Sequence, residues 1–451
     1  MSANLHRTIL QPVPAPEQQD PLLTALARVP RVVRIGKVAE AYGTMIRATG
    51  LKAMIGELCE LRNPRDRSFR LMAEVVGVSR QHTLLTPLGA LDGLAHDTEV
   101  IATGRQASVR AGDGLLGRIL DANGDAIDGR GSFGPTVQIP IYAASPNPLS
   151  RTLIDRPFAT GVRAIDTVMT AGVGQRLGIF AVAGGGKSTL LGMLARGGDA
   201  DVNVIALVGE RGREVNEFVH DNLGEAGLKK SIIVVATSDR PALERSRAAW
   251  VATAIAEYFR DRGKRVMLLV DSVTRFARAL RDVGLAIGEP PARRGFPPSV
   301  FSAMPRLFER AGNNDKGSIT AFYTVLMEGE DGDDPVAEEV RSILDGHIVL
   351  SRKLAAAYHY PAIDVLTSLS RTMPRVADEG HQRAAGQLRK YLAKHQDIEL
   401  LLQLGEYKRG SDAEADIAIE KIEPIRKLLK QSASDLADYK QSVDALRRLF
   451  G

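Results

Sequence analysis

Short stretches in which hydrophobic and polar residues alternate follow one another between residues 31 and 104. Gly residues, an Asn-Pro pair and Asp residues separate these stretches, as they do at the ends of short β-strands. The stretches with this character are 31–38, 43–48, 55–61, 71–78 and 82–85. Strands of this length and spacing predict a compact β-barrel or sandwich over residues 31–104.

Between residues 105 and 376 the apolar runs lose this alternation, and longer helical stretches lie between them. Such runs are typical of strands in a parallel sheet that helices cover on both faces. The runs are 176–182, 202–208, 231–236, 265–270 and 318–326. Residues 105–376 are therefore predicted to form an α/β domain.

The two ends of the chain follow neither pattern. Pro12, Pro14 and Pro16 interrupt any regular element, so residues 1–30 are predicted to form a flexible arm. The alternative interpretation of this arm is a docking peptide for a partner or for a membrane surface. Residues 377–451 are rich in helix formers, with Pro424 as their single proline, and predict a helical C-terminal domain.

The composition argues against several classes of protein. The 451 residues carry 59 basic and 54 acidic side chains, without the dense basic block that a dedicated nucleic-acid binder shows. The single cysteine, Cys59, allows no intrachain disulfide, and its place in an alternating stretch indicates a buried strand thiol. No apolar run has the length of a membrane span, and we expect no signal peptide.

A glycine-rich loop after the run 176–182 is the strongest chemical signal in the chain. Glycines there let backbone amides surround phosphate oxygens, and the helix that follows adds its positive dipole end. Lys187 would contact the β- and γ-phosphates of ATP, and the Ser188 hydroxyl would coordinate Mg²⁺. Ala181 replaces the first glycine of the phosphate-loop motif, which alanine can do where φ is negative. The predicted nucleotide contacts are Gly184, Gly185, Gly186, Lys187, Ser188 and Thr189.

Two acidic residues follow predicted strands, at the edge where open α/β sheets form their sites. Glu210 follows the run 202–208 after one glycine, and its carboxylate could hold the attacking water in line with the γ-phosphate. The alternative is an exposed glutamate in a charged turn. Asp271 follows the run 265–270, which is the Walker B pattern, and would steady Mg²⁺ or its waters.

Hydrolysis also needs positive charge to match the transition state. Arg371 lies well beyond the predicted strands and could act on a neighbouring subunit's γ-phosphate as an arginine finger. A helix cap or an ion pair with Asp364 would explain Arg371 equally well.

Two further stretches are predicted to be loops. The acidic run 328–334 lacks the ligand spacing of a calcium loop and is interpreted as a solvated loop. The proline-rich stretch 288–298 is interpreted as a shaped loop, in which Arg293 and Arg294 contact a central stalk, a substrate or another subunit.

Six ordered stretches carry a resemblance to a known family. They are Gly174-Gln-Arg-Leu-Gly-Ile-Phe-Ala, Gly209-Glu-Arg-Gly-Arg-Glu-Val, Asp271-Ser-Val-Thr-Arg-Phe-Ala-Arg-Ala-Leu-Arg-Asp, Gly288-Glu-Pro-Pro-Ala-Arg-Arg-Gly-Phe-Pro-Pro, Ile343-Leu-Asp-Gly-His-Ile-Val-Leu-Ser-Arg and His359-Tyr-Pro-Ala-Ile-Asp. From about residue 30 to its end, the chain resembles the type III secretion ATPases, which are relatives of the catalytic subunit of rotary ATP synthases. The resemblance implies a RecA-like P-loop ATPase domain of α/β class, with an N-terminal β barrel and a C-terminal helical domain.

The resemblance also implies roles for residues that match the family's motifs. Lys187 and Ser188 are similar to the phosphate and magnesium contacts, Glu210 to the catalytic glutamate, and Asp271 to the Walker B aspartate. Arg371 falls where the finger from the adjacent protomer lies.

Three more residues match positions that shape the family's site. Tyr360 falls where an aromatic ring stacks on the adenine, and Arg211 and Arg213 match neighbouring arginines. We expect Arg211 to take part in catalysis and Tyr360 in nucleotide binding.

Members of this family form homohexamers with sites between protomers, and they use ATP to release chaperones from export substrates and to unfold those substrates. The resemblance implies a ring in the bacterial cytoplasm, at the inner membrane and under the export gate. The implied partners are a central stalk protein, a peripheral stator protein and chaperone–effector complexes, with no nucleic acid among them. The C-terminal helices are the expected face for the chaperone complexes.

The family has an injectisome branch, which delivers effectors into host cells, and a flagellar branch. The stretches Ile55-Gly-Glu-Leu-Cys-Glu-Leu and Leu404-Gly-Glu-Tyr-Lys-Arg-Gly-Ser-Asp resemble the injectisome branch. A flagellar export ATPase stays the alternative.

Other ring proteins fit the sequence less well. An RNA-translocating RecA-like hexamer would need more aromatic residues in its β domain than Tyr42 and Phe69. A noncatalytic ring subunit would not need a carboxylate at Glu210, and the stretch after Leu404 disfavours a subunit of ATP synthase.

Overall fold

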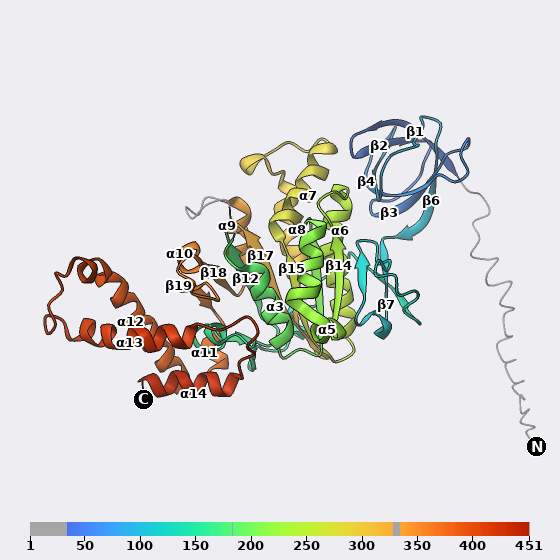
Figure 1. Cartoon of the computed structure of the whole chain (residues 1–451). Coiled ribbons are helices and arrows are strands. Elements are labelled where there is room, and N and C mark those ends of the chain that lie inside the picture. The colour runs from blue at the N-terminus through green and yellow to red at the C-terminus, as the bar shows by residue number, and fades with distance from the viewer. Residues whose placement is uncertain (1–33, 183, 328–333, 451) are drawn as a thin grey trace, which may run out of the picture.

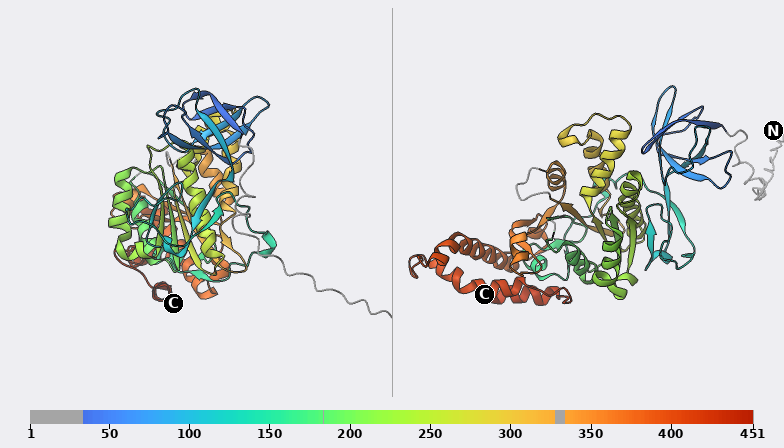
Figure 2. Two further views of the ribbon diagram at one scale, coloured as in Figure 1. Left: turned by 90° about the vertical axis from the view of Figure 1, so that its right-hand side faces the viewer. Right: turned by 45° about the horizontal axis from the view of Figure 1, so that its top comes forward.

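The computed structural model describes residues 34–182, 184–327 and 334–450. The predicted arm at residues 1–30 and the acidic residues 328–333 lie outside the described residues. A β-barrel, a large sheet with helices on its faces and a group of helices follow one another along the chain (Figure 1). Two further views place the barrel and the C-terminal helices on opposite sides of the sheet (Figure 2).

The N-terminal part is a closed antiparallel barrel with the strand order β1-β2-β5-β4-β3-β6. Its strands are β1 (Ile35–Tyr42), β2 (Met45–Thr49), β3 (Glu57–Arg62), β4 (Arg70–Val78), β5 (Thr83–Pro87) and β6 (Glu99–Gln106). The five predicted strands are all present. Because the sheet closes on itself, with β6 next to β1, this part is a barrel and not a sandwich. Cys59 is a buried thiol on β3, as expected, and burial raises its pKa to about 12.

The central sheet has the strand order β19-β18-β12-β17-β15-β13-β14-β8, and a short strand, β16, pairs with β17. The strands are β8 (Ile119–Asp121), β12 (Arg176–Ala181), β13 (Val202–Val208), β14 (Ser231–Ala236), β15 (Arg265–Asp271), β16 (Gly312–Asn313), β17 (Ser318–Leu326), β18 (Gly346–Leu350) and β19 (Ile363–Ser370). Each of the five apolar runs in the sequence forms one of these strands.

The sheet is parallel from β18 to β8, as predicted, but its other edge is not. β19 runs antiparallel to β18, with Leu350 opposite Ile363 and Gly346 opposite Ser370. Exposed and buried residues alternate along β19, because one face of this edge strand meets solvent. The prediction of a wholly parallel sheet was therefore wrong at this edge.

Helices cover both faces of the sheet and divide its core in two. Along β13, Val204 and Ala206 pack in one core cluster while Ile205 and Leu207 pack in the other. The first cluster includes residues of α6 (Ala242–Arg260), α7 (Val273–Ala286), α8 (Pro298–Phe308) and α9 (Pro335–Ile343). The second includes residues of α2 (Arg163–Val168), α3 (Lys187–Gly197) and the C-terminal helices.

The stretch 288–298 is the loop that its prolines predict. α7 ends at Ala286, one 3₁₀ turn follows at Arg293–Gly295, and α8 begins at Pro298. Arg293 and Arg294 are exposed on this loop. Their contact with a stalk, a substrate or another subunit stays a prediction.

The C-terminal part is helical, as predicted, and consists of α11 (Met373–Val376), α12 (Glu379–Leu404), α13 (Ala413–Leu429) and α14 (Tyr439–Phe450). Pro424, the single proline of this part, lies inside α13. Ile422, Ile425 and Leu428 around it are buried, and their packing compensates for the hydrogen bond that proline removes. The domain boundaries in the sequence analysis stay predictions.

A buried ion pair joins the barrel to the helices on the sheet. Glu74 of β4 and Arg247 of α6 lie 3.0 Å apart, and both side chains are buried. The Tyr142 hydroxyl donates a second hydrogen bond to the Glu74 carboxylate, over 3.3 Å. The Tyr142 ring in turn packs edge-on against Trp250, with ring centroids 5.6 Å apart.

We expect Arg247→Met to destabilise this junction by about 3–5 kcal/mol, because it leaves Glu74 buried without its counter-charge. Trp250 is the single tryptophan, so its fluorescence reports on the junction during urea unfolding. The midpoint should fall in Arg247→Met and stay unchanged in Arg65→Ala, whose ion pair with Asp97 is exposed on the arginine side. Equal midpoints for wild type and Arg247→Met would contradict the prediction.

Candidate active site

The glycine-rich loop lies at the carboxyl edge of the parallel strands, between β12 and α3 (Figure 1). Gly184 and Gly186 have φ values of 83° and 81°, a region that residues with a Cβ rarely adopt. Gly186 caps α3, so the amides of Lys187, Ser188 and Thr189 in the first turn have no acceptor within the helix. These amides and the helix dipole make the loop suited to binding phosphate.

Ala181 stands where the phosphate-loop motif has its first glycine. It is the last residue of β12, where the backbone is extended, and its side chain is buried. A glycine is therefore not needed at this position of the loop.

Two carboxylates meet the Lys187 ammonium group. Lys187 Nζ lies 3.1 Å from Glu210 Oε1 and is also hydrogen-bonded to Asp271 Oδ1. Burial alone would lower the pKa of Lys187, but the charges of Asp271 and Glu210 together raise it above its ordinary value. The lysine therefore keeps its positive charge at the mouth of the phosphate loop.

The order of the strands explains this meeting. β13 and β15 are parallel neighbours, with Leu207 opposite Asp271, and Glu210 follows the end of β13. Both carboxylates thus emerge at the same edge of the sheet as the phosphate loop. The structure brings together Lys187, Glu210 and Asp271 as the sequence predicts, and the alternative of an exposed Glu210 is wrong because its side chain is buried.

The oxygen donors at this edge suit Mg²⁺. Asp271 is buried and accepts a 2.7 Å hydrogen bond from the Thr324 hydroxyl, while Ser188 is exposed on the first turn of α3. Among residues 34–182, 184–327 and 334–450 no group of three or more His, Cys, Asp or Glu side chains could form a closed metal cage. A hydroxyl and a carboxylate beside a phosphate loop fit Mg²⁺, which keeps several waters and binds through phosphates.

Glu210 has two further partners that sequence reasoning missed. Arg275 Nη2 lies 3.3 Å from Glu210 Oε2, and the same arginine donates a hydrogen bond to the Gly209 carbonyl. Burial and a hydrogen bond with the Glu214 carboxyl together raise the pKa of Glu210 to about 7, against the opposing charge of Lys187. Such a carboxyl group can change its protonation state near neutral pH.

The sequence carries signals for these missed partners. Arg275 stands four residues after Asp271, and Glu214 four residues after Glu210. Thr324 is a polar residue near the end of the apolar run 318–326. Their contacts depend on which strands are neighbours, and that order is not visible in the sequence.

We expect the kcat/KM of ATP hydrolysis to fall as the pH drops below about 7, because Glu210 must be ionised to orient water. Glu214→Ala removes a hydrogen bond that raises the pKa of Glu210, so the midpoint of the profile should move to lower pH. The test is to measure kcat/KM from pH 5.5 to 8.5 for the wild type and for Glu214→Ala. The titration of ATP itself affects both proteins equally, so a difference between the two midpoints comes from the protein. An unmoved midpoint would show that Glu210 does not govern the profile.

Tyr360 lies beside the phosphate loop. A Cβ built on Gly186 would be 3.5 Å from Cε1 and 3.6 Å from Cδ1 of the Tyr360 ring. The ring is 41% exposed and faces Tyr358 at a centroid distance of 6.5 Å. The structure thus brings a partly exposed Tyr360 ring to the loop, which is compatible with a contact to the base of a nucleotide.

Arg371 lies at the opposite edge of the sheet. Its amide donates to the Asp345 carbonyl (3.0 Å), and the Asp345 amide donates to the carbonyl of Arg176, the first residue of β12. The loop follows the other end of β12, roughly 17 Å away at 3.3 Å per residue. The structure therefore does not bring Arg371 to the phosphate loop of its own chain.

The two alternative roles for Arg371 do not hold. Asp364 Oδ1 accepts hydrogen bonds from the Leu366 and Thr367 amides, and within the described ranges Arg371 has no side-chain partner. Thr372 rather than Arg371 occupies the N-cap of α11. The Arg371 side chain is exposed.

Arg211 and Arg213 are not in contact with Lys187. Arg211 pairs with Glu214 at 3.0 Å and Arg213 with Glu217 at 3.4 Å, and both arginine side chains are largely exposed. The Arg211 side chain pairs with Glu214, which in turn is hydrogen-bonded to the Glu210 carboxyl group. Its predicted part in catalysis stays a prediction.

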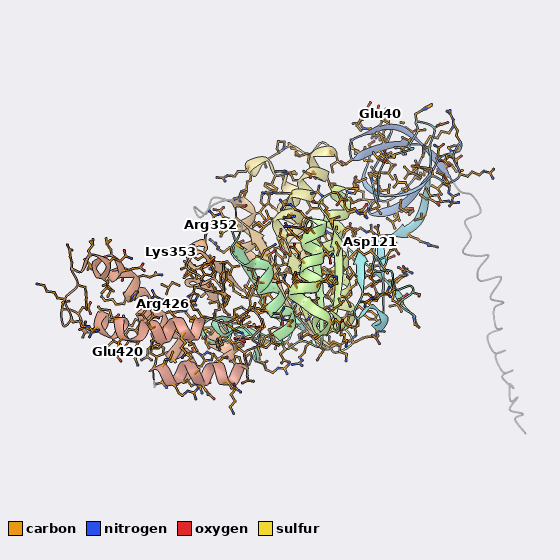
Figure 3. All side chains as sticks on the ribbon, in the orientation of Figure 1. Glu40, Asp121, Arg352, Lys353, Glu420 and Arg426 are labelled. Atoms are coloured by element: carbon orange, nitrogen blue, oxygen red, sulfur yellow. The ribbon has the colours of Figure 1, made fainter. Side chains whose placement is uncertain are left out.

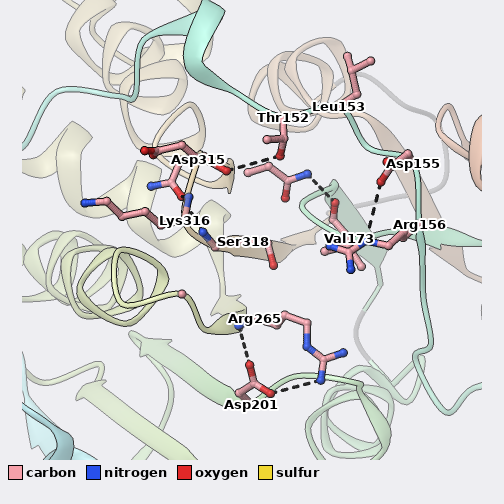
Figure 4. A pocket seen from close by; sticks show the side chains of 14 residues that line it. Thr152, Leu153, Asp155, Arg156, Val173, Asp201, Arg265, Asp315, Lys316 and Ser318 are labelled. Atoms are coloured by element: carbon pink, nitrogen blue, oxygen red, sulfur yellow. Dashed lines mark hydrogen bonds and ion pairs between the residues drawn. The ribbon is translucent and has the colours of Figure 1, made fainter.

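Two hollows elsewhere contain none of the predicted catalytic residues. One, of about 570 Å³, lies at the amino edge of β15 and β17, where Asp201 and Arg265 pair at 3.2 Å (Figure 4). The other, of about 400 Å³, lies between α10 (Arg352–Ala356) and the C-terminal helices, and Lys353 and Arg426 line it (Figure 3). Neither hollow is lined by Lys187, Glu210 or Asp271.

Three family models match the chain in order. They are the beta-barrel domain of the ATP synthase alpha/beta family (residues 38–104), the nucleotide-binding domain of that family (161–370) and the T3SS EscN ATPase C-terminal domain (377–448). Within residues 34–182, 184–327 and 334–450 no helix is both long and apolar enough to cross a membrane.

Known proteins resemble the chain over nearly its whole length. The Type 3 secretion system ATPase of Xanthomonas euvesicatoria is 56% identical over 92% of this chain and 93% of its own, and the Flagellum-specific ATP synthase of Bacillus subtilis is 48% identical over 93% and 95%. A solved structure of the assembled ATPase EscN with its central stalk EscO, from the enteropathogenic E. coli type III secretion system, matches with a TM-score of 0.85 and 48% identity. It covers 92% of this chain and 99% of that chain. The chain belongs to the type 3 secretion system ATPases of the ATP synthase alpha/beta family.

Proposed function

We propose that this ATPase hydrolyses ATP with Mg²⁺ at the Lys187 site and that hydrolysis powers protein export from the bacterial cytoplasm. The observation that carries the proposal is the meeting of Lys187, Glu210 and Asp271 at the mouth of the phosphate loop. Bound Mg²⁺, with Ser188 and Asp271 as its protein contacts, would neutralise charge on the phosphate oxygens.

Each side chain has a task that its environment supports. The loop amides and Lys187 bind the β- and γ-phosphates, and Tyr360 stacks on the adenine. Glu210 orients the attacking water, and Arg275 holds its carboxylate in place from 3.3 Å. Thr324 fixes the Asp271 carboxylate through a 2.7 Å hydrogen bond.

The position of Arg371 supports a ring with shared sites. An exposed arginine far from its own phosphate loop can complete only the site of a neighbouring chain. Placement at the opposite edge of the same sheet gives a head-to-tail contact, which closes into a ring when the rotation allows it. We infer a homohexamer in which each protomer supplies Arg371 to the next.

The remaining proposed binding partners of the ring are proteins of the export machinery. The exposed loop with Arg293 and Arg294 is the proposed contact with a central stalk protein, such as the one bound to the assembled EscN. Leu400 and Leu404 are exposed near the end of α12 and suit apolar contact with chaperone–effector complexes. We place the ring at the cytoplasmic face of the inner membrane, with a peripheral stator protein and the export gate as its other partners.

Flagellar export is the second candidate, because a flagellum-specific relative is 48% identical to this chain over 418 residues. The test is to remove the gene and to restore it as wild type or as Lys187→Ala. Loss of effector secretion that only the wild type restores supports the injectisome function. Loss of swimming alone would assign the flagellar function, and loss of neither would overturn export.

A further inference from the structure

Gln175 is a fully buried amide directly before β12. Its Nε2 donates to the Asp345 carbonyl at 2.9 Å and to the Ser370 hydroxyl at 3.0 Å. Its Oε1 accepts from the Gly172 amide at 2.8 Å and from the Thr372 hydroxyl at 2.5 Å. Both donors and both lone pairs of the amide are therefore used.

The partners of Gln175 surround Arg371 on the chain. Ser370 precedes Arg371 and Thr372 follows it, so the amide contacts the residue on either side. The Asp345 carbonyl that accepts from Gln175 also accepts from the Arg371 amide, at 3.0 Å. Three hydrogen bonds thus hold the chain around Arg371. Two join Gln175 to Ser370 and Thr372, and the third joins the Arg371 amide to the Asp345 carbonyl, which also accepts from Gln175.

The Arg371 side chain itself is exposed and, in the part of the chain that the structure describes, has no partner. Its direction therefore depends on how the backbone around it is held. A group that must meet a phosphate in another protomer depends strongly on this direction, because a displacement of about 1 Å can cost about 10²-fold in rate.

We propose that Gln175 is the positioning residue of the Arg371 finger. The Gln175 amide holds Ser370 and Thr372 so that Arg371 points at the nucleotide of the neighbouring protomer. Gln175 touches neither the nucleotide nor the water, and its effect passes through Arg371. The inference rests on the proposed finger role of Arg371.

Single-atom changes test the hydrogen bonds. Gln175→Glu replaces the Nε2 donor by an oxygen and loses the donations to Asp345 and Ser370, while it keeps an acceptor for Gly172 and Thr372. Thr372→Val removes the hydroxyl on the other side of Arg371, and Thr372→Ser keeps it. In full-length protein we expect kcat to fall about tenfold or more in Gln175→Glu and Thr372→Val, with KM for ATP within about twofold. Thr372→Ser should retain the activity of the wild type.

Mixed rings separate a misdirected finger from a damaged fold. A Gln175→Glu protomer keeps Lys187 and Glu210, and a Glu210→Gln protomer keeps its finger. A complete site forms where the phosphate loop of a Gln175→Glu protomer receives the Arg371 finger of a Glu210→Gln protomer. Mixing the two proteins, each of low activity alone, should therefore restore turnover. In randomly mixed rings about a quarter of the boundaries are complete, which sets the expected activity relative to wild type.

Each outcome decides the inference. A raised KM with unchanged kcat, or no gain of activity on mixing although gel filtration shows rings, would overturn the positioning role. If Arg371→Ala abolishes turnover while Gln175→Glu and Thr372→Val do not affect it, the positioning role fails and the finger stands. If Arg371→Ala itself leaves turnover unchanged, the shared-site mechanism fails first.

Discussion

Glu210→Gln is expected to lower the kcat of ATP hydrolysis by on the order of 10²–10⁴-fold while ATP still binds. The substitution keeps the size of the side chain and removes the negative charge that orients water. Glu210 is buried beside Lys187 and Arg275. The two neighbouring carboxylates have other tasks, because Asp271 is assigned to Mg²⁺ and Glu214 is hydrogen-bonded to Glu210 itself. Lys187 keeps Asp271 as a partner, and the phosphate loop should therefore stay intact.

The measurement pairs steady-state turnover with the binding of a fluorescent ATP analogue. Glu217→Gln is the matched control, because Glu217 pairs with Arg213 away from Lys187 and should keep the turnover of the wild type. Loss of turnover with unchanged binding supports catalysis by Glu210. Unchanged turnover would instead favour a ring subunit that binds nucleotide without hydrolysing it.

The catalytic edge was predictable because its signals are local. Lys187, Glu210 and Asp271 each lie within five residues of the end of an apolar run, and the carboxyl ends of parallel strands meet at one edge of a sheet. No strand order was needed to expect them together. Their burial and their distances, however, follow from β13 and β15 being neighbours.

Other features depend on pairings between distant segments. The sixth barrel strand, Glu99–Gln106, lacks a clear apolar pattern, and it became a strand because β1 and β3 pair with it on either side. The antiparallel β19 places Arg371 at the edge away from the phosphate loop. In the sequence, Gln175 is only a polar residue before a strand. Its four hydrogen-bond partners lie between three and 197 positions away along the chain, so their contacts cannot be predicted from the sequence.

Arg371→Ala is expected to lower kcat by on the order of 10³-fold or more, as loss of an arginine finger does. The site around Lys187 is untouched by this change, since Arg371 lies at the other end of β12 from the loop. ATP binding and the unfolding midpoint should therefore equal those of the wild type. The specific activity of the wild type should rise steeply with protein concentration, because the finger arrives only when protomers assemble.

Mixing makes the prediction specific to a finger in trans. A Lys187→Ala protomer cannot bind phosphate normally but keeps Arg371, whereas an Arg371→Ala protomer keeps Lys187, Glu210 and Asp271. Rings formed from both should recover about a quarter of wild-type turnover, since each complete boundary needs one protomer of each kind in one order. Arg375→Ala, an exposed arginine four residues further on, is the matched control and should retain full turnover. Activity that is independent of concentration and insensitive to Arg371→Ala would mean that each chain holds a complete site, and the exposed Arg371 would then need another role.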